Sequence, residues 1–356
     1  MERLGVAIIG CGNIARPYAN NIVTYPHMEL IGVTDLDVER AAAFAAEFNC
    51  RAYSSVVELL ADDAIAAVVN LTIPHVHAAI STQALEASKH VYSEKPMALT
   101  YADAQQLVAL AKQRGLRLGC SPSVFLGEAP QTAWKVVRSG RLGTVRLVYA
   151  EVNGGRIESW HPAPSSFYSV GPMFDIGVYP LTLLTTIFGP ARQVSAYGRV
   201  LFPDRLALDG TPFHIDTPEF IVAMVELTNG TLVRLTTNFY VQKQNTKQAG
   251  IEMHGDLGSL FLSSYQDFNA AVEFSELRQP YEPVPPVRPV YEGIEWGRGV
   301  SDFAEAILLN RPHRATGAQA AHVVEILCAV NDSLRSGAAV PISSSFTPPA
   351  PMEWAM

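Results

Sequence analysis

The chain of 356 residues has little charge, few cysteines and no cluster of basic residues. Charged side chains make up 17% of it and the formal net charge is −8. Binding of a nucleic acid is therefore not expected, because a phosphate backbone needs a basic patch. The four cysteines are widely scattered and form neither a CxxC pair nor a spacing typical of metal ligands. We accordingly expect no metal site.

Long apolar runs and a leader are also missing. No run reaches the roughly 18–20 residues of a membrane span, and Met1-Glu2-Arg3 passes directly into a strand-like segment. We therefore expect a cytoplasmic location, reduced cysteines and no membrane partner. Apolar side chains are plentiful, since 48% of the chain is hydrophobic. Such a chain can bury large cores, and its length suits two domains.

The first third of the chain alternates short apolar runs with helical patterns, which is typical of a parallel α/β sheet. The predicted strands are 5–9, 30–34, 66–71, 90–93 and 117–120. The predicted helices are 14–25, 38–48, 56–60, 75–87 and 101–113. Together they predict a dinucleotide-binding domain over residues 1–122.

Strand-like runs dominate after residue 122, once a helical segment at 129–138 has passed. The predicted strands are 145–152, 193–200, 219–227, 231–239, 250–254 and 259–262. Tight turns such as Asn229-Gly230 predict that the sheet is antiparallel. We predict a second domain over 123–356 that ends in helices at 300–309 and 317–334, with packing of these helices on the first domain as an option. The proline-rich stretch 280–289 is expected to be irregular and the tail 347–356 to be loose.

A glycine turn joins the first predicted strand to the first predicted helix, with the sequence Gly10-Cys11-Gly12-Asn13-Ile14-Ala15. The first glycine makes the tight turn, the second lets the backbone approach a pyrophosphate, and the small third residue lets helix and strand pack closely. The helix N-terminus adds N–H groups and a partial positive charge. We therefore predict that Gly10, Gly12, Asn13 and Ile14 bind the phosphates of a dinucleotide.

An acidic residue, Asp35, ends the second predicted strand 20 residues after Ala15. A carboxylate at this position accepts a hydrogen bond from the ribose 2′-hydroxyl of NAD and repels the 2′-phosphate of NADP. Arg40 is near in sequence, but we expect it on the outer face of the next helix. NAD is the expected cofactor, with NADP as the alternative.

Two further motifs carry a family resemblance. Glu94-Lys95-Pro96 follows the fourth predicted strand, after the stretch Leu71–His77, and a second block runs from Gly171 to Tyr179. With these motifs the chain resembles the glucose–fructose oxidoreductase/inositol dehydrogenase (Gfo/Idh/MocA) family over nearly its whole length. The resemblance implies an α/β Rossmann domain plus an α+β domain with a large, mainly antiparallel open-faced sheet. That sheet usually serves as the interface of a homodimer or homotetramer.

The resemblance also implies the activity, which is hydride transfer from a secondary hydroxyl (or hemiacetal carbon) of a sugar, cyclitol or glycoside. Lys95 would hydrogen-bond the reacting hydroxyl and stabilise the oxygen as it loses its proton. Tyr179 would take that proton beside the positive charge of Lys95, and Asp175 would orient Tyr179 or bind the substrate. Pro180 weakens the expectation that Asp175 and Tyr179 share a helix face.

Several residues beside the cofactor follow from the same resemblance. They are Thr72, Pro74, His77 and Glu94. We expect His77 to pack at, or cap, the next helix rather than to react.

The loop Glu158-Ser159-Trp160-His161-Pro162 combines an acid, an indole and an imidazole. Trp160 and His161 are candidates for lining a sugar pocket, and His161 is an alternative proton acceptor. A structured loop with a buried tryptophan is the competing interpretation. Many family members carry an arginine after the fifth strand that is missing here, and Gln131 and Trp134 are candidate replacements.

Three functions stay open at this point. The first is an NAD-dependent dehydrogenase of a small polyhydroxylated substrate. The second is a redox-cycling NAD-dependent glycosidase or lyase, and the third is a non-enzymatic NAD-binding regulator. The joint presence of Lys95, Asp175 and Tyr179 favours an enzyme, and the first function most.

Overall fold

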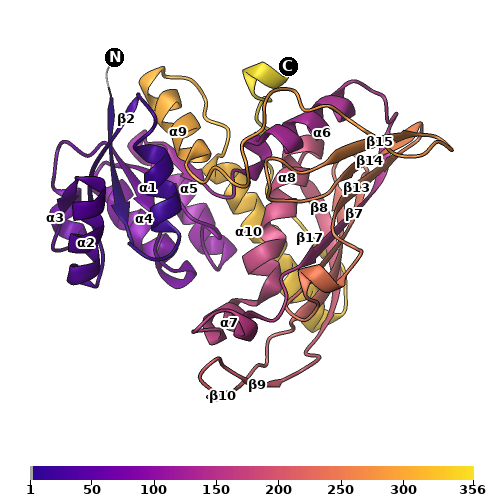
Figure 1. The fold of residues 1–356 in the computed structure, drawn as a ribbon, viewed down its shortest axis with the longest axis horizontal. Coiled ribbons are helices and arrows are strands. Elements are labelled where there is room, and N and C mark those ends of the chain that lie inside the picture. The colour runs from indigo at the N-terminus through magenta and orange to yellow at the C-terminus, as the bar shows by residue number, and fades with distance from the viewer. Residues whose placement is uncertain (1–2) are drawn as a thin grey trace. The chain divides into compact units, whose positions relative to one another are not determined.

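The computed structural model describes residues 3–356, and the chain forms two compact units (Figure 1). The first comprises Met1–Ser123 and Glu295–Val324, and the second comprises Val124–Ile294 and Glu325–Met356. The boundary expected after residue 122 thus lies beside the first division. The second domain is not continuous in sequence, because Glu295–Val324 groups with the first unit.

The first unit is built on a six-stranded parallel sheet with the order β3-β2-β1-β4-β5-β6. Its strands are β1 (Leu4–Ile9), β2 (Met28–Thr34), β3 (Arg51–Ala52), β4 (Ala67–Asn70), β5 (His90–Ser93) and β6 (Leu118–Cys120). Strand β1 pairs with both β2 and β4, so the direction of winding reverses there. Ligands of parallel sheets bind at the carboxyl ends of the strands beside such a switch point.

The helices of this unit are bounded only in part by local sequence signals. They are α1 (Ala15–Ile22), α2 (Val38–Phe48), α3 (Val56–Leu60), α4 (His77–Glu86), α5 (Tyr101–Arg114) and α9 (Arg298–Leu308). The side chain of Asp37 caps α2, and Thr100 caps α5. Helix α5 ends at Gly115, whose φ of 65° suits a glycine.

The second unit is built on a nine-stranded sheet with the order β16-β15-β14-β13-β7-β12-β11-β8-β17. Its strands are β7 (Val145–Asn153), β8 (Ala191–Arg199), β11 (Phe220–Leu227), β12 (Leu232–Asn238), β13 (Gly250–Gly255), β14 (Gly258–Leu262), β15 (Val272–Glu276), β16 (Glu282–Pro283) and β17 (Val340–Pro341). All neighbours are antiparallel except β7 and β12. The predicted fold class is therefore confirmed.

Short strands account for the differences from the sequence prediction. A separate hairpin of β9 (Asp204–Leu206) and β10 (Pro212–His214) was not predicted, and neither were β3, β15, β16 or β17. The two-residue strand β16 lies inside the stretch expected to be irregular, so that expectation is wrong there. Apart from β15, which has five residues, the missed strands have two or three residues and are too short to show a periodic pattern.

One face of the large sheet is covered and the other is open. Along β11, Ile221, Ala223 and Val225 are buried, whereas Met224 is 37% exposed. Helix α6 (Glu128–Arg138) packs against β14 and β15. This alternation is typical of an antiparallel sheet with helices on one side.

The core helix of the second unit is a nearly continuous stretch, Ser165–Phe188. It consists of α7 (Ser165–Pro172), a π-helical turn η4 (Met173–Gly177) and α8 (Val178–Phe188), with a break at Gly171. By length and composition this stretch matches a membrane span, contrary to the expectation that no segment would. However, 83% of the most apolar 18-residue segment of this stretch is buried inside the protein, as in a core helix.

The C-terminal tail is ordered against α6, so the expectation of a loose tail is wrong. Ala355 is fully buried in η6 (Glu353–Ala355), and its carbonyl accepts a 2.6 Å hydrogen bond from Arg138. The guanidinium of Arg288 lies 3.8 Å from the ring centroid of Trp354. These contacts depend on residues far apart in sequence, which local patterns do not reveal.

Candidate functional site

The glycine turn after β1 has the shape that a dinucleotide needs. A Cβ atom at Gly10, whose φ is 98°, would lie 2.8 Å from the carbonyl oxygen of Leu71, so only glycine fits. A Cβ atom at Gly12 would meet no described atom within 4 Å. The second glycine therefore borders open space, as the backbone must where a pyrophosphate approaches.

Helix α1 follows this turn without a side-chain cap. Ile14 occupies the N-cap position and makes no capping hydrogen bond. Gly12 and Asn13 are exposed beside it. In the first turn of α1, the Ala15 N–H already donates to the carbonyl oxygen of Gly12 at 3.0 Å and Pro17 has no N–H. The exposed backbone of Gly12 and Asn13 is therefore the part of the turn that a phosphate can approach.

Asp35 connects the glycine turn to the end of β2. Its Oδ2 accepts the N–H of Cys11 at 2.7 Å, and its Oδ1 accepts the N–H of Asp37 at 2.9 Å. Arg40 lies on the exposed face of α2, as expected, with its side chain 51% exposed, but its guanidinium also reaches Asp35 Oδ1 at 3.2 Å, which was not expected. The first turn of α2 begins directly after Asp37, which brings the guanidinium back over Asp35. Burial, together with the charge of Asp35, raises the pKa of the Cys11 thiol to about 12.

A buried amide, which the sequence analysis missed, organises the loop after β4. Asn70 donates to the carbonyl oxygen of His77 at 3.0 Å and to Ser81 Oγ at 3.1 Å. Its Oδ1 accepts the hydroxyl of Thr72 at 2.6 Å. A lone amide at the end of an otherwise apolar strand was the available signal. Asn70 positions Thr72, and Pro74 opens the short 3-10 turn that follows.

His77 joins this loop to the Glu94-Lys95-Pro96 segment. Its Nδ1 lies 2.7 Å from the carbonyl oxygen of Pro96 and its Nε2 lies 3.0 Å from that of Thr72. Burial lowers the pKa of His77, while the two carbonyl groups and the charge of Glu94 oppose that shift. The ring, which is 1% exposed, therefore couples two loops instead of facing solvent.

Glu94 fixes the backbone of Lys95. Its Oε1 accepts the Tyr18 hydroxyl at 2.5 Å, and its Oε2 accepts the N–H of Lys95 at 2.9 Å. Tyr18, on the buried side of α1, also lies 2.6 Å from Ser121 Oγ. Lys95 is half-buried and precedes a cis bond to Pro96. The backbone of Lys95 is thus held by a buried network that includes two unpredicted residues, Tyr18 and Ser121.

The second unit carries Asp175 and Tyr179 within its core helix. Asp175 lies in the π-helical turn and is half-buried, whereas Tyr179 lies in the first turn of α8 and is 4% exposed. Pro180 also falls in that first turn, where a missing N–H is tolerated, so the helix continues. Asp175 and Tyr179 therefore belong to one continuous helical segment.

An aromatic cluster forms where the loop before this helix meets its first turn, from Trp160 and His161 of the loop and Phe167 of α7. The ring centroids of Trp160 and His161 are 5.3 Å apart, and those of His161 and Phe167 are 4.7 Å apart. Trp160 is 55% exposed, so the interpretation of a buried tryptophan is wrong. His161 Nδ1 accepts the N–H of Ala163 at 3.0 Å. The neutral ring therefore carries its proton on Nε2, where it donates rather than accepts.

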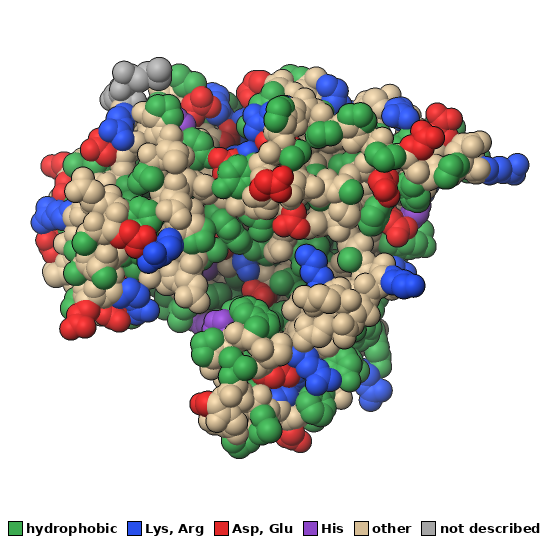
Figure 2. All heavy atoms as spheres, in the orientation of Figure 1, with side chains coloured by type: hydrophobic (Ala, Val, Ile, Leu, Met, Phe, Trp, Pro, Cys, Tyr) green, Lys and Arg blue, Asp and Glu red, His purple; other side chains and the backbone are tan. Residues whose placement is uncertain are grey.

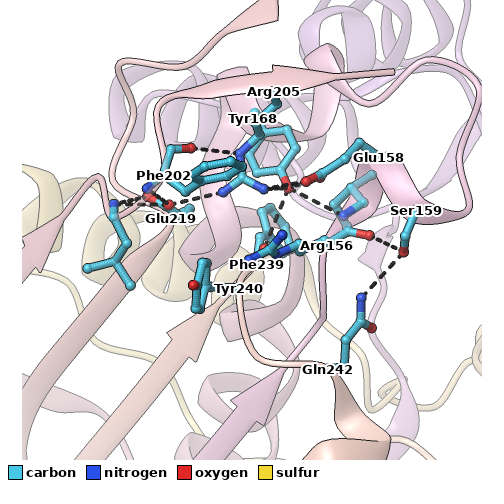
Figure 3. A network of polar contacts seen from close by, with 12 residues as sticks. Arg156, Glu158, Ser159, Tyr168, Phe202, Arg205, Glu219, Phe239, Tyr240 and Gln242 are labelled. Carbon is cyan, nitrogen blue, oxygen red and sulfur yellow. Dashed lines mark hydrogen bonds and ion pairs between the residues drawn. The ribbon is translucent and has the colours of Figure 1, made fainter. Parts of the chain in front are cut away.

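A buried ionic network holds this loop in place (Figure 3). The Arg205 guanidinium, fully buried, pairs with Glu158 at 2.6 Å and with Glu219 at 3.0 Å. It also donates to the Tyr168 hydroxyl at 2.8 Å and to the carbonyl oxygen of Phe202 at 2.9 Å. Burial and Glu158 raise the pKa of Tyr168. The network ties the hairpin of β9 and β10 to the loop that bears Trp160.

The two candidate replacements for the missing arginine are structural. Gln131 is fully buried, donates to the carbonyl oxygen of Phe125 at 2.8 Å and accepts the N–H of Met352 at 3.0 Å. Trp134 is 6% exposed and lies beneath Arg138. Gln131 thus bonds the C-terminal tail directly, whereas Trp134 packs on Arg138, which bonds the tail at Ala355. Both side chains are buried in structural contacts, which does not support their suggested role as replacements for the arginine.

Charge on the surface is dispersed. Over the face shown in Figure 2, Lys and Arg side chains alternate with Asp and Glu. Within residues 3–356 no group of three or more His, Cys, Asp or Glu residues is arranged to hold a metal ion.

Comparison with known proteins gives the family. The model of the "Oxidoreductase family, NAD-binding Rossmann fold" matches residues 4–121, and that of the "GFO/IDH/MocA C-terminal domain" matches residues 131–261. The chain belongs to the Gfo/Idh/MocA family. The predictions of an NAD-binding Rossmann domain and of an oxidoreductase are thereby confirmed.

Individual Gfo/Idh/MocA proteins resemble the chain at moderate identity. The dTDP-3,4-didehydro-2,6-dideoxy-alpha-D-glucose 3-reductase of Streptomyces antibioticus is 30% identical over 62% of this chain and 68% of its own length. The 1,5-anhydro-D-fructose reductase of Ensifer adhaerens is 26% identical over 73% and 75%. A levoglucosan dehydrogenase, in complex with NADH and L-sorbose, superposes with a TM-score of 0.84 at 20% identity, covering 97% of this chain and all of that one. For other curated relatives the chain spans about half of their length.

Proposed function

We propose that the protein is an NAD-dependent dehydrogenase. The substrate would be a sugar, cyclitol or glycoside whose secondary hydroxyl or hemiacetal carbon loses a hydride to the nicotinamide. The observation that carries the proposal is the buried network around Glu94, which holds Lys95 on a dinucleotide-binding unit. Several relatives with a named activity act on sugars, which supports a polyhydroxylated substrate.

The proposed reaction assigns a role to each candidate residue. NAD, when bound, would supply the nicotinamide that receives a hydride from the carbinol carbon. The Lys95 ammonium would stabilise the substrate oxygen as it loses its proton, and Tyr179 would take that proton. Asp175, in the turn before Tyr179, would orient the tyrosine or bind a substrate hydroxyl. Loss of one hydride to the nicotinamide and one proton to Tyr179 would convert a secondary alcohol into a ketone, or a cyclic hemiacetal into a lactone.

The exposed aromatic cluster would bind the sugar ring. Trp160 offers a flat apolar face, which carbohydrate sites commonly use against the C–H face of a sugar. His161 would donate from Nε2 to a substrate hydroxyl. Because its Nδ1 already accepts the N–H of Ala163, we propose Tyr179 rather than His161 as the group that takes the proton.

We propose NAD over NADP because the Asp35 carboxylate would repel a 2′-phosphate. Arg40 weakens this repulsion, since its guanidinium lies 3.2 Å from that carboxylate. The preference should therefore be moderate. None of the four cysteines, all of which lie in the described part of the chain, forms a disulfide bond, which fits the proposed cytoplasmic location.

We also propose a homodimer or homotetramer that forms through the open face of the large sheet. Tyr197, Met224 and Leu232 are 60%, 37% and 40% exposed on its strands. Light scattering after gel filtration should give a multiple of the chain mass, and Tyr197→Lys with Met224→Lys should give the single chain. A monomeric wild-type protein would contradict the proposed interface.

The proposed activity is tested with a panel of aldoses, inositols and glycosides, each with NAD and with NADP. Reduced-nicotinamide absorbance should rise for at least one substrate, faster with NAD, and Lys95→Ala should abolish it. Glycoside cleavage without net reduction would indicate the redox-cycling glycosidase or lyase instead. If NAD binds but the reduced-nicotinamide absorbance rises with no substrate of the panel, a regulator would be favoured.

A further inference from the structure

Arg156 is held against two aromatic rings at the start of the loop that bears Trp160. Its guanidinium carbon lies 5.1 Å from the ring centroid of Phe202 and 4.6 Å from that of Tyr240 (Figure 3). The residue is half-buried. Over residues 3–356, no ion pair or hydrogen bond formed by this guanidinium is found. The chain therefore orients the charge of Arg156 without neutralising it.

The acidic side chains nearby already have other partners. Glu158 bonds Arg205 with one oxygen and the Tyr168 hydroxyl with the other. Glu219 accepts the N–H groups of Leu201 and Phe202 in addition to its pair with Arg205. Two arginines thus flank this loop. Within residues 3–356, Arg205 forms ion pairs with two carboxylates and Arg156 forms none.

The backbone that leads into Arg156 is fixed by its neighbours. Gly155 has a φ of 71°, and a Cβ atom there would lie 2.3 Å from Gln242 Oε1. The amide of Gln242 also lies 3.4 Å from Ser159 Oγ. The side chain of Arg156 therefore starts from a constrained position and is further restrained by Phe202 and Tyr240.

A guanidinium whose face is covered by aromatic rings still presents its N–H edge. That edge is a rigid fork which matches the two oxygens of a carboxylate or a phosphate. Only three residues separate Arg156 from Trp160, the proposed ring-binding residue. We propose that Arg156 binds an anionic group, a carboxylate or a phosphate, on the sugar or cyclitol substrate. This inference rests on the proposed dehydrogenase function.

The test compares matched neutral and charged probes. D-Glucose is paired with D-glucuronate and with D-glucose 6-phosphate, D-galactose with D-galacturonate, and myo-inositol with an inositol monophosphate. Dissociation constants are measured by calorimetry on the full-length protein saturated with NADH, and NAD reduction is measured in parallel. For at least one pair, the charged member should bind about 10-fold tighter or more.

Variants assign that preference to Arg156. Arg156→Gln should bring the ratio of the two dissociation constants close to one, and Arg156→Lys should retain part of it, because lysine keeps the charge and loses the fork. Arg141→Gln is the matched control, since Arg141 also lies over an aromatic ring, that of Phe274 at 3.9 Å. Thermal melting checks that all three variants fold.

The outcomes separate the two proposals. A preference for uronates identifies a carboxylate ligand, and a preference for sugar phosphates identifies a phosphate. If neutral sugars are oxidised and no charged member is preferred, or if Arg156→Gln keeps the preference, the Arg156 inference is wrong and the dehydrogenase function stands. If no member of any pair is bound or oxidised, both proposals fail.

Discussion

Replacing Arg205 by methionine should destabilise the second unit strongly. The Arg205 and Glu219 side chains are fully buried and that of Glu158 is 11% exposed. Methionine fills a similar volume but leaves two carboxylates without their cation. Removing one charged partner from such a buried ionic network lowers the free energy of unfolding by about 3–5 kcal/mol.

A matched exposed pair gives the control. Arg192 pairs with Glu226, and their side chains are 59% and 26% exposed. Arg192→Met should cost at most about 1 kcal/mol, because exposed pairs are screened by water and salt. Unfolding in urea, followed by fluorescence and circular dichroism, gives both free energies. In a thermal scan, Arg205→Met should lower the melting temperature by on the order of 10 °C.

A charge-neutral combination tests the physical reason. Arg205→Met with Glu158→Gln and Glu219→Gln should recover much of the lost stability, because no unpaired charge is then buried. A loss below about 1 kcal/mol for Arg205→Met would refute the reasoning. So would a triple variant that is no more stable than Arg205→Met alone, since the loss would then come from packing.

Three other predictions concern the first unit. Gly12→Ala should leave the melting temperature of the apoprotein nearly unchanged but weaken NADH binding in a fluorescence titration, because the added methyl enters the open space meant for the pyrophosphate. Cys11, whose pKa is raised to about 12, should resist iodoacetamide at pH 8, and fast labelling seen by mass spectrometry would contradict its burial. Burial lowers the pKa of His77, so below about pH 6.5 the unfolded chain binds a proton that the folded chain does not. Melting temperature should therefore fall from pH 7 to pH 5.5, and less steeply in His77→Gln; an equal slope would show that His77 does not contribute.

Much of the fold follows from local signals. Helices α2 (Val38–Phe48) and α3 (Val56–Leu60) lie at the predicted residues, because capping side chains and apolar spacing define them locally. The long strands of both sheets are also where apolar runs predicted them. The missed strands are short, and they are stabilised by pairing with distant segments; β17, for example, pairs with β8.

The features of the candidate site also fall into two groups, those that local sequence signals predict and those that depend on tertiary contacts. The sequence alone determined the glycine turn, Asp35 and the Glu94-Lys95-Pro96 segment, because each depends on residue type at a fixed spacing along a strand-turn-helix unit. Only the tertiary structure decided that Arg40 reaches Asp35 and that Trp160 is exposed. It also decided that Arg205 forms ion pairs with carboxylates while Arg156 forms none within residues 3–356. Those features depend on which distant side chains meet, and hydrogen bonding and burial at such contacts leave no periodic pattern in the sequence.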